Sequence, residues 1–349
     1  MNLMQLPCAH GIPPVSGRLR VTPEDFVVRE WLGFAADGEG DHWLLTVRKR
    51  GANTHWVAKQ LGKLAQIHPR DVGYAGLKDR NAVTEQAFTL PVRSAMTDWS
   101  GVTGDGFEVI RAERHRRKLK RGALRGNEFE ILIRDFTGEI ASLEGLMERI
   151  AALGVPNYFG PQRFGNDGSN LTRAQRWFGG DIELHDRFER GFALSAARAA
   201  IFNDVLAERV NAGSWNLLQA GDVANLDGSN SVFKVDALDD TLTERCRIQD
   251  IHPTGPLWGR GELASQADVA ALEREVAQRN AVLSEGLARI DMDQERRSLR
   301  LHVSDLSWSV ETDGLRLRFR LPKGAFATSV LHEILQDAFA QGHLEADEE

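Results

Sequence analysis

The sequence has few of the features that mark secreted, disulfide-rich or membrane-spanning proteins. Its 349 residues include only two cysteines, Cys8 and Cys246, which excludes a framework of several disulfides. No apolar run approaches the roughly 18 residues that a membrane-spanning helix needs. The first ten residues do not combine a basic start with an apolar core, as a secretory signal does. We therefore expect a cytoplasmic protein.

Metal and cofactor signals are equally sparse. Cys8 and His10 are spaced like two metal ligands, but no second pair follows at ligand spacing. We therefore expect chemistry that uses neither a metal nor a cofactor. Hydrophobic residues make up 42 % of the chain, enough for a sizeable core in one large domain or two ordinary ones.

The chain is negative overall, but positive charge is concentrated in one segment. The net charge is -7, yet residues 111–125 contain eight lysines and arginines against one glutamate, which leaves -14 for the rest. A single apolar leucine, Leu119, is too little for a core helix, although a solvated basic loop is an alternative. Such an asymmetry favours nucleic-acid binding.

The most specific motif is residues 73–86, GYAGLKDRNAVTEQ, followed by an apolar strand pattern. Its glycines permit a sharp turn or a close approach to a ligand. Asp79 stands between Lys78 and Arg80, whose positive charge favours an ionised carboxylate. An ionised, positioned aspartate can act as a nucleophile or as a base. A charged surface turn is the alternative for the central tripeptide taken alone.

Four further segments carry polar and aromatic residues that suit RNA. Asn127 and Phe129 follow the basic segment and could bond to a base edge and stack on it, although a turn asparagine and a core phenylalanine fit as well. Residues 157–165 interleave aromatics with Arg163, which suits RNA stacking but also a core-packed turn. Phe26 follows a Pro-Glu-Asp turn, which by itself indicates only turn chemistry. Phe326 precedes a helix start, where a buried staple residue is the alternative.

Together these motifs, in this order, resemble the tRNA pseudouridine synthase D family along almost the whole chain; residues 252–259, HPTGPLWG, add to the likeness. The resemblance implies an α+β pseudouridine synthase core with a mixed, mostly antiparallel sheet flanked by helices, plus an inserted α+β domain. It implies a discontinuous catalytic domain, 1–154 and 304–349, around an inserted domain at 155–303.

The resemblance also implies the reaction, in which uridine 13 in the D stem of tRNA is isomerised to pseudouridine after the base is flipped out of the stem. Asp79 is the implied catalytic residue. Phe26, Asn127 and Phe326 line the implied uridine pocket, and Phe129 supports it. The RNA backbone contacts that we expect are Lys78, Arg80, Arg116, Arg117, Lys118, Lys120, Arg121 and Arg125.

The residues leave the mechanism open. Asp79 could attack the sugar, attack the base, or remove a proton from the sugar C2′. In an extended segment the side chains of Lys78 and Arg80 point away from that of Asp79, so the cation that pairs with Asp79 is expected from elsewhere in the fold. We expect a monomer with no obligate protein partner, because the chain has no coiled-coil heptad.

Two other functions share these features. An RNA-binding or RNA-chaperone protein would use the same basic and aromatic residues without catalysis. A nucleoside or glycoside hydrolase would need a second carboxylate, for which only Glu24 or Asp25 is a candidate.

Periodicity predicts the secondary structure in outline. We expect a hairpin turn at Asp313-Gly314. Strands are expected at 25–31, 42–47, 86–90, 106–111, 128–133, 299–303, 308–310 and 315–321. Helices are expected at 53–67, with Leu64 on the buried face, at 142–153 and 195–210 with Ser142 and Ser195 as caps, and at 266–289 and 328–340. Residues 213–260 read as irregular or short-stranded.

Overall fold

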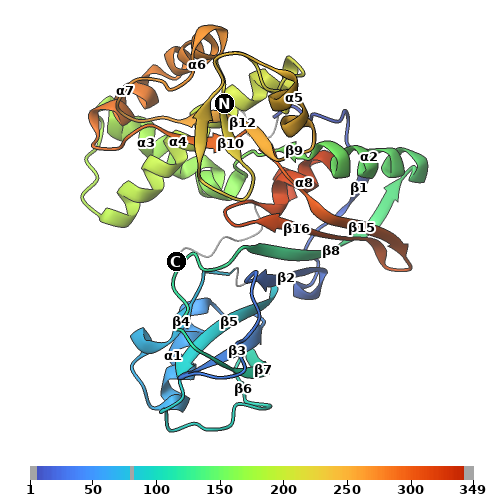
Figure 1. Cartoon of the computed structure of the whole chain (residues 1–349), viewed down its shortest axis with the longest axis vertical. Coiled ribbons are helices and arrows are strands. Elements are labelled where there is room, and N and C mark those ends of the chain that lie inside the picture. Colours follow the sequence, from blue (N-terminus) through green and yellow to red (C-terminus); the bar gives the residue numbers. More distant parts are fainter. Residues whose placement is uncertain (1–5, 79–81, 342–349) are drawn as a thin grey trace. The chain divides into compact units, whose positions relative to one another are not determined.

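The computed structural model describes residues 6–78 and 82–341, and contacts divide them into two compact units. The large-sheet unit comprises residues 17–136 and 304–324. The helix-rich unit comprises 6–16, 137–303 and 325–341. Both contain helices and strands, so the expected α+β class is confirmed (Figure 1).

The large sheet has ten strands in the order β15-β16-β8-β2-β5-β3-β7-β6, with β1 beside β8 and β4 beside β5. Strands β2 and β5 pair in parallel, whereas the pairs β2–β8, β3–β5, β3–β7, β8–β16 and β15–β16 are antiparallel, so the sheet is mixed and mostly antiparallel, as expected. The strands are β1 (Val15–Arg18), β2 (Phe26–Trp31), β3 (His42–Lys49), β4 (Gly73–Tyr74), β5 (Val83–Pro91), β6 (Thr103–Gly104), β7 (Phe107–His115), β8 (Gly126–Gly138), β15 (Ser304–Glu311) and β16 (Gly314–Pro322).

Strand alternation gives the sheet two chemically different faces. Val28, Phe129 and Phe319 lie opposite one another on β2, β8 and β16, and they share one face, which we call the motif face. Their neighbours Arg29, Glu128 and Arg320 occupy the other, which we call the charged face.

Helix α1 (Thr54–Ala65) covers part of the motif face. Asn53 caps it, since its side chain accepts a hydrogen bond from the Trp56 N–H at 2.7 Å. Val57 and Leu61 are buried against the sheet residue Phe88. This packing fixes the start of α1 beside β3 and β5 (Figure 1).

A short 3-10 turn, Pro23–Asp25, sets the start of β2. Thr22 and Asp25 form a capping box, in which the Asp25 carboxylate accepts from the Thr22 N–H at 2.8 Å. Asp25 is buried and pairs with Arg134 on β8 at 2.7 Å. The turn therefore fixes Phe26, the next residue, on the motif face.

The helix-rich unit contains a four-stranded antiparallel sheet, β11-β10-β12-β13, and a two-stranded ladder of β9 and β14. Its core is formed around α4, whose buried side chains include Ala196, Ala200 and Phe202. The helices are α2 (Ile140–Leu153), α3 (Ser169–Gly179), α4 (Arg187–Asn211), α5 (Asp240–Arg247), α6 (Ala267–Arg279), α7 (Ala281–Arg289), α8 (Ala327–Ile334) and α9 (Ala338–Gln341). The strands are β9 (Val155–Pro156), β10 (Val223–Leu226), β11 (Val232–Lys234), β12 (Ile251–Leu257), β13 (Glu295–Ser298) and β14 (Arg300–Leu301).

Most expected elements are present, but several ends were wrong. The helix expected at 266–289 breaks at Asn280, whose side chain bonds to Asp204 at 2.8 Å and to the Val276 carbonyl at 3.1 Å. Asp186, not Ser195, caps α4, which therefore begins eight residues earlier than predicted.

Smaller differences occur in three other helices. Glu139, not Ser142, precedes α2, and Leu64 on α1 is exposed rather than buried. The final helix is interrupted at Leu335, which has extended backbone angles. The segment 213–260, expected to be irregular or short-stranded, contains the short strands β10 and β11, but also the helix α5 and the seven-residue strand β12.

The compact units do not have the bounds of the expected domains. Helix α2 and residues 325–341 group with the segment that we expected to be an insertion. The functional division into a catalytic domain and an inserted domain stays a prediction.

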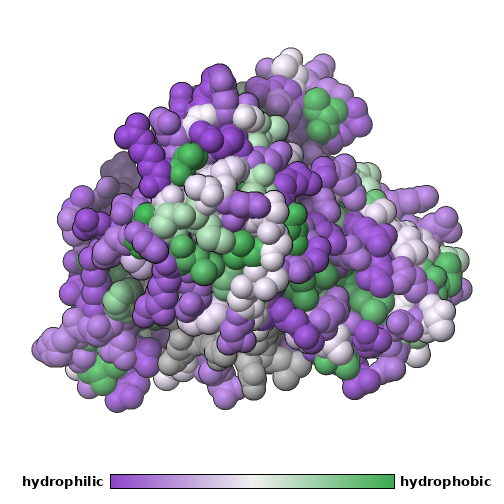
Figure 2. All heavy atoms as spheres, turned by 90° about the horizontal axis from the view of Figure 1, so that it is seen from below, coloured by the Kyte–Doolittle hydropathy of each residue, from purple (hydrophilic) through white to green (hydrophobic). Residues whose placement is uncertain are grey.

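The surface is that of a protein rich in charged side chains. Hydrophilic residues predominate on the face in Figure 2, where hydrophobic residues form small groups among them. Within the described ranges, no helix has the length and apolar character required to cross a membrane.

We predict that Asp25→Asn lowers the free energy of unfolding by about 2–3 kcal/mol at neutral pH, because it leaves Arg134 without its buried anion. Burial by itself would raise the pKa of Asp25, but hydrogen bonds from Arg134 and Thr22 hold it below its usual value. The stabilisation is therefore complete above about pH 4 and lost as the pH falls through the lowered pKa. Urea unfolding of both proteins at neutral and acidic pH measures this.

Asp135→Asn is the control, because Asp135 pairs with Arg18 on the exposed surface. Equal losses in the two variants, or an Asp25 effect that does not shrink in acid, would contradict the role of the buried pair.

Candidate active site and nucleic-acid interface

The motif segment, residues 73–86, runs from β4 into β5. Gly73 and Tyr74 pair with the far end of β5, so the chain leaves the sheet at Ala75 and returns at Val83. Asp79 and Arg80 lie outside the described residues. Their catalytic and phosphate-binding roles stay predictions.

Buried hydrogen bonds fix the backbone that leads to Asp79. The Thr54 hydroxyl accepts from the Lys78 N–H at 3.1 Å and donates to the Gln86 side chain at 3.0 Å. Gln86 in turn donates to the Gly76 carbonyl at 2.6 Å. Thr54 and Gln86 are fully buried. Residues 76–78 are therefore held between α1 and β5.

Lys49, at the end of β3, is a buried cation beside this segment. The residue is 1 % exposed, and its ammonium donates to the Lys78 carbonyl at 3.1 Å and the Ala52 carbonyl at 2.9 Å. A buried lysine is rare unless its charge is compensated. Lys49 thus brings positive charge to the peptide that precedes Asp79.

Sequence reasoning missed Lys49 and Thr54. Lys49 is on the apolar side of the alternating β3 pattern, with Leu45 and Val47, and a charge on that side is the available signal. In the sequence, Thr54 is recognisable only as a residue at the start of a helix. Its contacts depend on how α1 packs against the sheet.

Lys78 is not on the surface. Its ammonium forms a buried ion pair with Glu30 at 2.9 Å, and their side chains are 7 % and 2 % exposed. The other Glu30 oxygen accepts from the Ala87 N–H at 3.0 Å. In this structure Lys78 therefore links the motif segment to β2 and β5, and its expected phosphate contact gains no support from its position.

Three predicted pocket residues lie on neighbouring strands of the motif face. Phe26 is on β2, while Asn127 and Phe129 are on β8. Asn127 is opposite Glu30, the partner of Lys78. The structure therefore brings the Asn127 position beside the network that holds the motif segment.

The two phenylalanines are buried, whereas Asn127 has an unused acceptor. Phe129 packs between Phe26 and Phe319, with ring centroids 6.2 and 5.4 Å away. Arg20 lies over the Phe26 ring at 4.2 Å. The Asn127 Oδ1 is buried and accepts no hydrogen bond within the described part of the chain.

Phe326 belongs to the helix-rich unit, where it precedes α8 and packs near Phe159 at 6.2 Å. A pocket shared by Phe26, Asn127 and Phe326 stays a prediction.

The basic segment ends in a loop, residues 116–125, which we call the basic loop. Its buried Leu119 anchors it, and the Leu119 N–H donates to Thr89 at 2.9 Å. The Gly122 N–H donates to the Ala75 carbonyl at 2.7 Å. A side chain at Gly73 would lie 2.7 Å from the Leu119 carbonyl, so this glycine permits the close approach. The structure thus brings the basic loop beside the motif segment.

The predicted phosphate-binding side chains of this loop are exposed. Exposed residues are Arg116, Arg117, Lys118, Lys120, Arg121 and Arg125. Arg116 pairs with Glu39, and Arg121 lies over the Tyr74 ring at 4.4 Å. Arg117 and Lys120 contact no carboxylate within residues 6–78 and 82–341. The loop therefore presents uncompensated positive charge.

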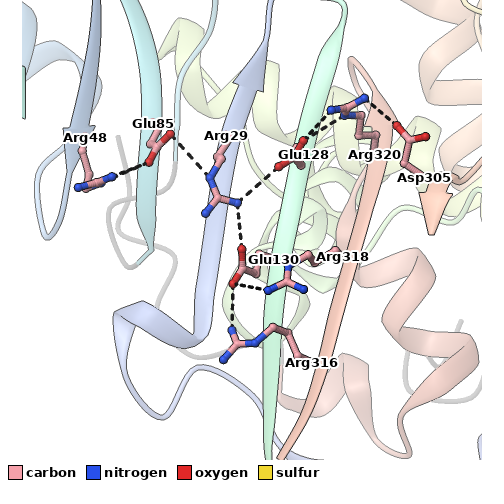
Figure 3. Close-up of polar contacts among 9 residues, drawn as sticks. All are labelled: Arg29, Arg48, Glu85, Glu128, Glu130, Asp305, Arg316, Arg318 and Arg320. Atoms are coloured by element: carbon pink, nitrogen blue, oxygen red, sulfur yellow. Dashed lines mark hydrogen bonds and ion pairs between the residues drawn. The ribbon is translucent and has the colours of Figure 1, made fainter. Parts of the chain in front are cut away.

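The arginines of the charged face are compensated instead. Figure 3 shows a ladder of alternating charges that crosses five neighbouring strands and reaches Asp305 on β15. Arg29 contacts Glu130 at 3.1 Å, and Arg320 contacts Glu128 at 2.9 Å. The residues of the ladder are Arg29, Arg48, Glu85, Glu128, Glu130, Asp305, Arg316, Arg318 and Arg320. The paired charges make this face of the sheet polar but add little net positive charge to it.

The alternatives for other chemistry have weak structural support. The second carboxylates proposed for a hydrolase are both paired: Asp25 with Arg134, and Glu24 with Arg50 at 2.8 Å. Outside the three undescribed stretches, no group of three or more His, Cys, Asp or Glu side chains could hold a metal.

We predict that Thr54→Val lowers the free energy of unfolding by about 2 kcal/mol, because it leaves the Lys78 N–H without its acceptor and the Gln86 Oε1 without its donor. Thr103→Val, on the exposed strand β6, is the control and should change stability by less than about 0.5 kcal/mol. Urea unfolding at neutral pH measures both. Equal stabilities of wild type and Thr54→Val would show that the hydroxyl does not hold the segment.

Comparison with known proteins agrees with these features. The family model described as tRNA pseudouridine synthase D matches residues 7–174 and 171–334. A tRNA pseudouridine synthase D of Methylococcus capsulatus is 47 % identical over 333 residues, covering 95 % of this chain and 94 % of the relative. That of Nitrosococcus oceani is 46 % identical, with the same coverage.

A solved structure supports the fold. The crystal structure of a Methanosarcina mazei protein assigned as tRNA pseudouridine synthase D has a TM-score of 0.77. It is 21 % identical and the match covers 97 % of this chain and 98 % of that chain. The match to the family model and the identity to relatives over nearly the full length show that the chain belongs to the tRNA pseudouridine synthase D family, isomerases that convert uridine in tRNA to pseudouridine.

Proposed function

We propose that this protein isomerises uridine 13 in the D stem of tRNA to pseudouridine, with Asp79 as the catalytic residue and without a cofactor. One observation carries the proposal: the segment that leads to Asp79 is fixed by buried polar groups and is hydrogen-bonded, through Ala75 and Gly122, to an exposed basic loop. A fixed backbone leading to a carboxylate, beside a surface of exposed basic side chains, suits chemistry on a nucleotide.

The reaction balances without an external reagent. The N1–C1′ bond breaks, a C5–C1′ bond forms, the C5 proton is lost, and N1 gains a proton. Asp79 can start the reaction by attack on the sugar or the base, or by removing a proton from C2′. Each route needs an ionised Asp79, which positive charge from Lys49 would favour.

The proposed pocket uses residues of the motif face together with Phe326. The buried Asn127 Oδ1, which lacks a donor among the described residues, can accept from an N–H of uracil. Stacking on Phe26 and Phe326 would contribute roughly 1–3 kcal/mol per ring. Since the Phe26 ring is 4 % exposed, stacking there requires the Arg20 side chain to move aside. The uridine must leave its stem to reach any such pocket.

We expect wild-type protein to form pseudouridine at position 13 of an unmodified tRNA transcript, and Asp79→Asn to form none. Carbodiimide treatment and primer extension map the product, and the supernatant is assayed for uracil. Asp71→Asn is the control, since it removes a carboxylate from the 3-10 turn Pro69–Asp71 just before the motif and should retain activity.

Three outcomes would count against the proposal. Released uracil would indicate a hydrolase. Tight, salt-sensitive binding without modification would indicate an RNA-binding protein. Pseudouridine at another position would agree with the enzyme class but would refute position 13 as the target.

A second prediction concerns the basic loop. The double variant Arg117→Gln/Lys120→Gln should reduce the steepness of the plot of log affinity for tRNA against log salt by about 1–2. Each phosphate contact that the wild-type protein forms releases counterions, and the variant forms fewer such contacts. Lys59→Gln/Lys63→Gln, on the exposed side of α1, removes the same charge and should leave the slope unchanged. Equal slopes for both double variants would exclude the loop from the interface.

A further inference from the structure

Arg163 occupies an unusual position in the helix-rich unit. It lies in a 3-10 turn, Pro161–Phe164, which ends at Gly165. Gly165 has a φ of 76°, a conformation that favours glycine. The turn directs the guanidinium of Arg163 towards two rings, at 5.3 Å from the centroid of Phe159 and 5.7 Å from that of Phe326.

Arg163 lacks the carboxylate partners that two other arginines of this unit have. Arg209 pairs with Asp222 at 3.0 Å, and Arg296 pairs with Glu273 at 2.8 Å. The Nε of Arg163 is buried without an acceptor, and no carboxylate within the described ranges pairs with its guanidinium. Burial lowers the pKa of Arg163. A desolvated cation of this kind is costly unless an anion binds it.

A second guanidinium adds to the positive potential. Arg297 lies 4.2 Å from the centroid of the Phe159 ring that Arg163 also contacts. It donates to the Asn157 side chain at 2.7 Å. The two guanidinium groups therefore lie against one ring, where their like charges repel each other.

Other donors converge on the same place. A cavity of about 10 Å³ is lined by Arg163, Phe326, Thr328 and the residues 160–162. It lies at the start of α8, where backbone N–H groups and the helix dipole favour an anion, and Phe326 offers no side-chain cap. The Thr328 hydroxyl can also donate. The cavity has room for about one oxygen, and one of its lining residues, Gln162, is exposed.

We propose that Arg163, Thr328 and the N-terminus of α8 bind a backbone phosphate of the tRNA, adjacent to the nucleotide that stacks on Phe326. One phosphate oxygen would enter the cavity, and the others would remain at its rim. This proposal rests on the proposed function for the role of Phe326, but the anion site itself follows from contacts within the helix-rich unit.

The test is the salt dependence of tRNA binding by the full chain. Arg163→Gln should lower the slope of log affinity against log salt by about 0.7–0.9, the contribution of one phosphate contact. It should raise KM more than it lowers kcat. Arg163→Lys keeps the charge and should retain most of the slope.

Arg190→Gln is the matched control. Arg190 also belongs to the helix-rich unit and lies over a ring, that of Trp177, at 5.4 Å. This variant removes the same charge and the same kind of contact outside the cavity, so the slope should not change. If Arg163→Gln unfolds, Arg163→Met repeats the measurement with a side chain that still packs on the rings.

A transcript with one neutral methylphosphonate linkage next to the target uridine identifies the phosphate. It should bind wild type more weakly than the unmodified transcript, but should not weaken binding to Arg163→Gln further. An unchanged slope in Arg163→Gln with a lower kcat would overturn the proposal, because Arg163 would then only orient Phe326. Equal weakening of both proteins by every neutral linkage tested would also overturn it. Failure of wild type to modify position 13 would refute the proposed function while leaving the slope measurement valid.

Discussion

The buried polar network beside the motif segment is the constraint on which the candidate site depends. Thr54, Gln86 and Lys49 are almost completely enclosed, and each bonds to the backbone of residues 76–78. Enclosed polar groups are costly when unpaired, so this backbone has one favourable arrangement rather than several. Residues 76–78 are thereby tied to α1 and the large sheet. Catalysis by a single carboxylate depends on such support, because small displacements of a reacting group are expensive.

Charged residues are arranged differently on the two faces of the large sheet. On the motif face, Glu30 and Lys78 form a buried pair beside Asn127. On the charged face, arginines and carboxylates alternate across the strands and neutralise one another (Figure 3). Uncompensated positive charge is left to the basic loop, which crosses beside the start of the motif segment. Counting arginines in the sequence therefore overstates the surface available to RNA, since most on the sheet are already paired.

Sequence patterns predicted the sheet well because strand alternation and turn chemistry are local. The hairpin at Asp313-Gly314 and the strands around Phe26 and Phe129 are confirmed. Patterns did worse where a distant side chain decides the outcome. Asn280 ends a helix because Asp204 is positioned to bond to it. Lys78 is buried because Glu30, far away in sequence, lies beneath it.

The sequence by itself determined the family, the α+β class, the motif around Asp79 and the concentration of basic residues. These properties depend on residue types and on short spacings, so they can be inferred without knowledge of the fold. Only the tertiary structure decided that Lys49 and Thr54 hold the motif segment and that the basic loop bonds to Ala75. It also decided that Arg163 lies beside two rings and pairs with no carboxylate among the described residues. Each of these depends on burial and on contacts between segments distant in the chain, and burial decides whether a charge is paired, solvated or available to a ligand.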